Sequence, residues 1–181
     1  MLLHVERPPL EHVNDAFDRL FLREYPRCVA IARRLLFDPH LAEDVAQDAF
    51  LEFTRRHDAD APFASVWLHR AALHSAMNVL RQNRRRMQRE RKNAALEAPL
   101  LAAAATFDPL HTALRSEEQR LVRSALRRMS GRHRAVLALR YAGLSYAETA
   151  TALGIKTNHV GTLLARAEAA LTKEISRVPS R

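Results

Sequence analysis

A chain of 181 residues is long enough for one ordinary domain or two small ones. It has only 4 glycines and is rich in alanine, leucine and arginine, so its composition favours an all-helical fold. One cysteine, Cys28, excludes a disulfide framework, the N-terminus lacks the apolar core of a signal peptide, and no uncharged stretch could span a bilayer. We therefore expect a helical protein of the cytoplasm.

The formal net charge of +9 is unevenly distributed along the chain. Counting lysine and arginine against aspartate and glutamate gives −3 for residues 1–80, +6 for residues 81–92 and +6 for residues 93–181. Two separate basic zones indicate two contacts with a polyanion, most simply a nucleic acid. The alternative is a pair of solvated helix faces.

The N-terminal part predicts a short lead and two helices. Residues 1–12 contain two prolines and are expected to be poorly ordered. Asn14 or Asp15 can cap the first helix, in which Pro26 predicts a break or restart. Asp38 and Pro39 open a second helix. Its apolar side carries Leu41, Val45, Ala49, Phe50 and Phe53, and its opposite side carries Glu43, Asp44, Gln47, Asp48 and Glu52.

A polar loop at 57–62 separates this acidic helix from a long helical pattern that starts at Phe63 and runs into the arginine cluster. Residues 93–112 carry two prolines and little charge, which is typical of a linker. Further helices are expected from Ser116 and, capped by its hydroxyl, from Ser130.

The region from Gly143 onward predicts a helix-turn-helix. Ser145 and Glu148 have the spacing of a capping box, and Gly154 suits the left-handed end of the helix that this box begins. Thr157 is a candidate cap for a second helix, whose apolar residues follow at helical spacing. Such a unit commonly places its second helix in the DNA major groove, although an ordinary helical hairpin is the alternative.

Four motifs resemble those of the extracytoplasmic-function (ECF) group of sigma factors, within the sigma-70 family of bacterial RNA polymerase. The segment DAFDRLF at 15–21, with YPR at 25–27, resembles the family's opening helices. AEDVAQDAFL at 42–51 resembles its acidic signature, and WLHRAA at 67–72 resembles the start of its promoter-melting helix. LRYAGLSYAETA at 139–150 resembles its fourth conserved region. Four motifs in the expected order make the resemblance specific.

The resemblance implies two helical domains joined by a linker. Residues 13–92 would form sigma region 2, which docks on core polymerase and recognises and melts the minus ten element. Residues 113–177 would form region 4, which recognises the minus thirty-five element, with residues 93–112 between them. The expected partners are core RNA polymerase, through its clamp coiled coil and its flap, and promoter DNA. The expected polymerase contacts are Asp44, Gln47, Asp48 and Leu51.

The resemblance places recognition of the minus ten element on the helix that starts near Trp67, whose own ring we expect to lie in the core. Positive charge along that helix can follow a phosphate backbone. The candidates are Arg70, His74, Asn78, Arg81, Arg84, Arg85 and Arg86. His74 and Asn78 stand where relatives often have asparagine and aspartate, which affects the expected base preference. The loop at 57–65 would capture a flipped base, but no single residue can be chosen.

The second helix of the helix-turn-helix would read the minus thirty-five element. Its candidates are Lys156, Asn158, His159, Thr162 and Arg166. Gly161 and Leu163 occupy positions that are often lysine or arginine in the family. Gly161 would allow a close approach of the backbone to phosphate. A helix with fewer charges predicts a weaker salt dependence of binding.

Two other functions stay open at this point. A conventional dimeric helix-turn-helix regulator would need no polymerase. A sigma-like protein could bind polymerase or a regulator and recognise promoters only weakly, as Gly161 and Leu163 suggest. An anti-sigma factor is an expectation of the family alone. His69 and His74 lack the spacing of a zinc helix, and the sequence has no phosphate-binding glycine loop and no G-x-S-x-G motif, so we expect no metal, no cofactor and no enzymatic activity.

Overall fold

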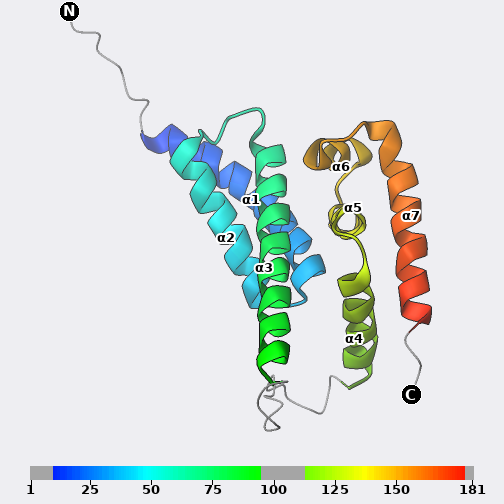
Figure 1. Ribbon diagram of the computed structural model, residues 1–181. Coiled ribbons are helices and arrows are strands. Elements are labelled where there is room, and N and C mark those ends of the chain that lie inside the picture. The colour runs from blue at the N-terminus through cyan, green and yellow to red at the C-terminus, as the bar shows by residue number, and fades with distance from the viewer. Residues whose placement is uncertain (1–9, 95–112, 178–181) are drawn as a thin grey trace, which may run out of the picture.

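The structure is a computed structural model that describes residues 10–94 and 113–177 (Figure 1). Every regular element in these two ranges is an α-helix, as the composition predicts. None of these helices is both long enough and apolar enough to cross a membrane. The helices are α1 Leu10–Leu36, α2 Pro39–Arg56, α3 Ala64–Ala94, α4 Ala113–Arg128, α5 Gly131–Tyr141, α6 Tyr146–Leu153 and α7 Thr157–Ser176. Residues 1–9 of the predicted lead (1–12) and most of the predicted linker, 95–112, lie outside the described residues, whereas residues 10–12, expected to be poorly ordered, begin α1.

Helix α1 is longer than predicted, and it is continuous. It begins at Leu10, four residues before the predicted cap at Asn14, and it passes through Pro26 without a break. Proline removes one hydrogen bond to the carbonyl four residues earlier, that of Leu22. Pro26 is exposed and Leu22 is 75% exposed, so water can solvate this side of the helix. The predicted break at Pro26 is therefore wrong.

The cap of α2 is as predicted. The Asp38 carboxylate accepts a hydrogen bond from the backbone N–H of Leu41 at 3.1 Å, and Pro39 occupies the first turn. The apolar side of α2, from Val45 to Phe53, packs against α1 and α3. Leu41 was predicted on that side but is 38% exposed, whereas the next residue, Ala42, is fully buried.

Helix α3 contributes to the core only along its first half. Its 31 residues span about 46 Å at about 1.5 Å per residue. Leu68, Ala72, Leu73 and Ala76 are buried, whereas the helix is exposed around Arg81 and beyond. The ring of Trp67 packs on Phe53 with centroids 5.5 Å apart, consistent with the expected core position. The helix ends at Ala94, two residues inside the predicted linker.

The C-terminal helices form the predicted helix-turn-helix. The capping box of α6 is complete: Glu148 N–H donates to Ser145 Oγ at 3.2 Å, and Ser145 N–H donates to Glu148 Oε2 at 2.7 Å. Gly154 ends the helix with φ +64°. The cap of α7 is Lys156 rather than Thr157, which is already helical, and the Lys156 side chain makes no capping hydrogen bond. Upstream, Ser130 caps α5 as predicted, while α4 begins three residues before Ser116.

Helices α5 and α6 lie between α3 and α7 (Figure 1). On one side they pack against α1 and α3, and on the other side against α7. One buried cluster combines residues of α1, α2 and α3 with Ala135, Ala138, Leu139, Leu144 and Ala152. A second cluster, around Val136 and Val160, joins α5, α6 and α7. The N-terminal and C-terminal units are thus docked on each other.

Candidate nucleic-acid interface

The acidic side of α2 is open to solvent. Gln47 and Asp48 follow Asp44 by three and four residues and precede Leu51 by four and three, so the set shares one side of the helix. All four are exposed, and Leu51 is 54% exposed. Glu52 pairs with Arg56 at 3.2 Å, but within the described part of the chain no ion pair involves Asp44 or Asp48. These two carboxylates, beside an exposed leucine, can meet a basic protein surface that has an apolar centre.

The predicted basic residues of α3 form a stripe. Arg70, His74, Asn78, Arg81 and Arg85 follow each other at intervals of three or four residues, and all are exposed. The Arg81 guanidinium donates to the Asn78 side-chain oxygen at 2.6 Å, which orients both groups along the helix. Arg86 is exposed beside the stripe, and the side chain of Arg84 lies outside what the structure describes. This stripe is suited to run along a phosphate backbone.

The loop between α2 and α3 presents one exposed aromatic ring. Phe63 is 46% exposed, and its ring stands edge-on to that of His57 with centroids 5.1 Å apart. His57 is half-buried and packs on Trp67, with centroids 5.6 Å apart. Ser65 donates to the buried Glu24 at 2.8 Å and so points into the protein. The family resemblance predicts that this loop captures a base, but the sequence selects no residue for it. In the structure, Phe63 is the aromatic side chain that the loop exposes.

The outer side of α7 carries the other predicted DNA contacts. Asn158, His159, Thr162 and Arg166 are exposed on this helix, and Lys156 is exposed at its start. No side chain caps α7, and its third N–H, that of His159, donates to the Lys156 carbonyl at 3.0 Å, so the N–H groups of Thr157 and Asn158 remain as donors for an acceptor such as phosphate. Base contacts by a recognition helix usually come from this N-terminal part.

Gly161 and Leu163, the two residues of α7 that differ from the family pattern, do not lie on this outer side. Leu163 packs with the C-terminal core beside Val160, so a charged residue there would be turned inward. A Cβ on Gly161 would be 3.6 Å from the Tyr146 ring of α6, so this glycine faces its neighbouring helix. The expected close approach of Gly161 to phosphate stays a prediction, and this geometry does not support it. These two residues therefore do not support the alternative of a sigma-like protein that recognises promoters only weakly.

The structure contains a buried polar cluster, beneath the stripe of α3, that was not among the predicted site residues. Glu24 and His69 are each 1% exposed, and the Glu24 carboxylate lies 2.8 Å from His69 Nε2. Ser65 donates to the same carboxylate at 2.8 Å and Arg23 at 2.7 Å. A sequence signal does exist, since Glu24 interrupts the apolar row of Leu20 and Cys28 at a spacing of four residues. A buried carboxylate at such a position needs partners.

Both groups of this pair have lowered pKa values. Burial lowers the pKa of His69, although the adjacent Glu24 carboxylate opposes the shift. Burial alone would raise the pKa of Glu24, but hydrogen bonds from Arg23, Ser65 and His69 bring it below its usual range. His69 is therefore neutral and donates from Nε2 to an ionised Glu24. Its Nδ1 is buried and finds no hydrogen-bond partner among the described residues.

Stability is expected to fall as the pH is lowered below about 6.5, the ordinary pKa of histidine. Below that pH the unfolded chain protonates His69 while the folded chain does not, so protons favour unfolding. Glu24 acts in the same direction at lower pH, because its stabilisation is lost as the pH falls through its folded-state pKa. Urea unfolding at pH 7.5, 6.0 and 5.0 measures the loss. His69→Leu should flatten the slope between pH 7 and 5, whereas His74→Gln, at an exposed histidine, should not; equal slopes in all three proteins would contradict the assignment.

Comparison with known proteins assigns both halves of the chain. Residues 20–86 match the family model for sigma-70 region 2, and residues 119–171 match that for sigma-70 region 4. The ECF RNA polymerase sigma factor SigM of Mycobacterium tuberculosis is 34% identical over 164 residues, covering 87% of this chain and 76% of SigM. The RNA polymerase sigma-H factor of Pseudomonas aeruginosa is 29% identical over 175 residues, covering 88% and 86%.

Two solved structures share the fold. CnrH in complex with the cytosolic domain of CnrY has a TM-score of 0.59 at 24% identity, covering 92% of this chain and 91% of that chain. RpoE in complex with the anti-sigma factor NepR, from Bartonella quintana, has a TM-score of 0.53 at 20% identity, covering 92% and 100%. The motifs, the helical architecture and these relatives agree, and the chain belongs to the ECF group of the sigma-70 family, the alternative sigma factors that bind core RNA polymerase and direct transcription initiation at promoters.

Proposed function

We propose that this sigma factor works through three separate surfaces, one each on α2, α3 and α7. The observation that carries the proposal is their common exposure: the described side chains of each predicted set are open to solvent, on helices that are anchored in the core by their other side or, for α3, by their first half. We assign residues 13–92 to polymerase docking and the minus ten element, and residues 113–177 to the minus thirty-five element. The protein itself performs no chemistry and acts in the cytoplasm on the polymerase that does.

The α2 surface is the proposed polymerase contact. Asp44 and Asp48 supply the charge that steers docking on a basic partner, and Leu51 supplies apolar area that docking removes from water. Gln47 lies between them and can hydrogen-bond as donor or acceptor. We therefore predict that changing the charge of Asp44 or Asp48 acts mainly on the association rate, and that shortening Leu51 raises the dissociation rate.

The α3 stripe is the proposed contact with the minus ten element. Its arginines neutralise phosphates, and Asn78, held by Arg81, can offer its amide to a base edge. The exposed ring of Phe63, at the N-terminal end of the same helix, can stack on a base that leaves the duplex. Region 2 would thereby combine backbone positioning with base capture.

The α7 surface is the proposed contact with the minus thirty-five element. Arg166 can donate to the two acceptors of guanine and Asn158 can pair with adenine, while Lys156 and the uncapped first turn hold phosphates. Each surface by itself binds modestly. Polymerase bound to both units would hold them over one promoter and raise the effective concentration of the second contact.

An anti-sigma factor is the regulator that we propose for this chain. The two solved structures of similar fold support the idea, since RpoE was solved with the anti-sigma factor NepR and CnrH with the cytosolic domain of CnrY. Co-purification of the tagged protein from its own cells, with and without Asp48→Arg, would separate such a partner from polymerase.

Transcription with purified components tests the proposal. The protein is added to sigma-free core polymerase with fragments of its own genome, and the transcript starts are mapped. We expect starts preceded by a shared two-part element. Polymerase binding without transcripts would contradict the promoter surfaces, and no binding to polymerase would contradict the α2 surface.

Arg166→Ala is expected to weaken polymerase-dependent promoter binding about tenfold and to relax base preference at one position of the upstream element, because a bidentate contact to guanine contributes roughly 1–3 kcal/mol. Lys173→Ala is the matched control, since Lys173 is an exposed basic residue in the last turn of the same helix. Binding to a randomised promoter library followed by sequencing measures both effects. A uniform loss on all sequences, or the same loss for Lys173→Ala, would contradict base reading by Arg166.

A further inference from the structure

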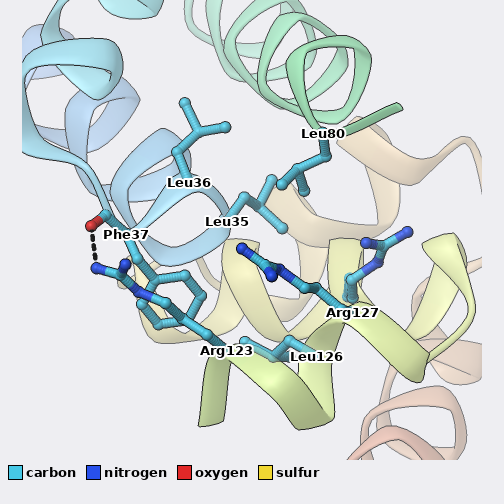
Figure 2. Close-up of a pocket in the computed structure, with 8 residues that line it drawn as sticks. Leu35, Leu36, Phe37, Leu80, Arg123, Leu126 and Arg127 are labelled. Carbon is cyan, nitrogen blue, oxygen red and sulfur yellow. Dashed lines mark hydrogen bonds between the residues drawn. The ribbon is translucent and has the colours of Figure 1, made fainter. Parts of the chain in front are cut away.

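A small pocket lies where the end of α1 meets α3, α4 and α5 (Figure 2). Its apolar wall is formed by four leucines, namely Leu35, Leu36, Leu80 and Leu126. Leu35, Leu36 and Leu80 lie across the pocket from Leu126 (Figure 2). The cavity of about 30 Å³ has room for one small group rather than for a whole ligand of ordinary size. A molecule bound here therefore inserts only one end.

Positively charged side chains complete the lining of this pocket. They are Arg123 and Arg127 of α4 and Arg134 of α5. Among the described residues that line the pocket there is no acid to balance them. The nearby Asp38 is engaged elsewhere, since its carboxylate accepts the capping hydrogen bond of α2. Arg127 is exposed and takes part in no ion pair within the described part of the chain. The pocket thus joins an apolar wall to uncompensated positive charge.

Arg123 is held in place at the edge of the pocket. Its guanidinium donates to the backbone carbonyl of Phe37 and lies over the Phe37 ring, 5.1 Å from the centroid. The Nε atom of the same guanidinium is buried and finds no hydrogen-bond partner among the described residues. A buried N–H group without an acceptor is costly, and an anionic oxygen within reach would satisfy it.

The backbone of Phe37 is strained at this position. Its φ of +56° is a left-handed conformation that bulky residues rarely adopt. Such strain persists only where the surroundings enforce it, and it is frequent where a protein clamps a ligand. Here the conformation turns the chain from α1 towards α2 and sets both the carbonyl and the ring of Phe37 against Arg123. The strained residue thereby fixes the orientation of one charged group of the pocket.

We propose that this pocket binds a small organic anion, a carboxylate or a phosphate monoester that carries a short apolar group. Arg123 and Arg127 bind the anionic oxygens, which are strong acceptors for a planar guanidinium. The apolar group lies against Leu36, Leu80 and Leu126, where it leaves water. The site is independent of the proposed polymerase and promoter contacts, because none of the residues that line it belongs to those surfaces.

A titration of the full-length protein, followed by NMR of isotope-labelled leucine methyl groups, tests the proposal. The probes are isovalerate and isopentyl phosphate, which share an apolar body and differ in the anionic group. We expect saturable shifts at Leu36, Leu80 and Leu126, with a Kd of about 1 mM for the better probe. Uncharged isovaleramide, inorganic phosphate and acetate are the control ligands, and each should bind at least about fivefold more weakly. The tighter of the two probes identifies the anionic group that the pocket prefers.

Matched variants separate the two halves of the pocket. Arg127→Gln should weaken binding of the better probe about fivefold or more, because it removes an exposed guanidinium without disturbing the core. Arg120→Gln, at another exposed arginine of α4 that does not line the pocket, should change the affinity less than about twofold. Leu36→Phe keeps every arginine but fills the cavity, so it should abolish the saturable shifts at Leu80 and Leu126. If this variant does not fold, the comparison of isovalerate with acetate tests the apolar contact without a substitution.

Three results would overturn the proposal. The first is no saturable shift with either organic anion. The second is equal binding of isovalerate and isovaleramide, which would leave an apolar cavity without anion recognition. The third is an equal loss for Arg120→Gln and Arg127→Gln, which would indicate a general attraction of anions to a basic protein.

Discussion

The Asp48→Arg variant is expected to bind core RNA polymerase about 100-fold more weakly than the unchanged protein while remaining folded. Asp48 is exposed on α2 between Asp44 and Leu51, so an arginine there needs no repacking. The partner surface implied by the family is basic, and like charges brought together at an interface cost several kcal/mol, of which about 2.7 corresponds to 100-fold. Titration of labelled protein with core polymerase, at two salt concentrations, measures the change.

Two further variants define the surface. Asp18→Arg reverses an exposed acid on α1 outside the proposed contact and should change the affinity less than about twofold. Leu51→Ala should weaken binding about tenfold through faster dissociation, with little dependence on salt. An equal loss for Asp18→Arg and Asp48→Arg would indicate a general charge effect and would remove α2 as the specific contact.

Glu24→Ala is expected to destabilise the protein by about 3 kcal/mol. The substitution removes the acceptor of three hydrogen bonds and leaves His69 buried without a partner on either ring nitrogen. Breaking one member of a buried polar pair typically costs about 3–5 kcal/mol when both are charged, and somewhat less when one is neutral. For a chain of this size, the midpoint of thermal unfolding should fall by roughly 10 °C.

The double variant Glu24→Leu and His69→Leu tests whether each residue is needed because the other is buried, or whether the loss of stability reflects packing alone. Two apolar side chains leave no buried polar group of the pair unsatisfied, so the double variant should be more stable than Glu24→Ala and than His69→Leu. A double-mutant cycle on urea unfolding gives the coupling between the positions. Additive losses would show that the two residues act independently, contrary to the 2.8 Å contact.

Features decided within a few residues of each other could be predicted from the sequence. The capping box of Ser145 and Glu148 and the left-handed Gly154 depend on backbone hydrogen bonds inside a single turn, and they are as expected. The acidic side of α2 and the arginine-rich end of α3 also follow from helical periodicity. The family motifs identified the class of protein, while the individual contact residues stay predictions, because the partner surfaces that define them are not part of this chain.

Local rules failed where the outcome depends on what surrounds a residue. Pro26 was expected to interrupt α1, but the helix continues because its exposed side allows water to replace the lost hydrogen bond. Leu163 was counted as a missing DNA contact, yet the packing of α7 on α5 turns it inward. In both cases the identity of the residue was known, and only its environment decided the effect.

The helices, most of their ends and the charge of each exposed side could be read from the amino-acid sequence, since they depend on neighbours three or four residues away, and the four motifs indicated the sigma-factor class. Only the tertiary structure paired Glu24 with His69, Arg27 with Glu148, and Arg123 with Phe37, which are 45, 121 and 86 residues apart. No periodic pattern encodes such pairs, because a contact between distant segments depends on how whole helices dock. The docked arrangement of the two units belongs to this second kind of information, because residues of both units share one buried apolar cluster.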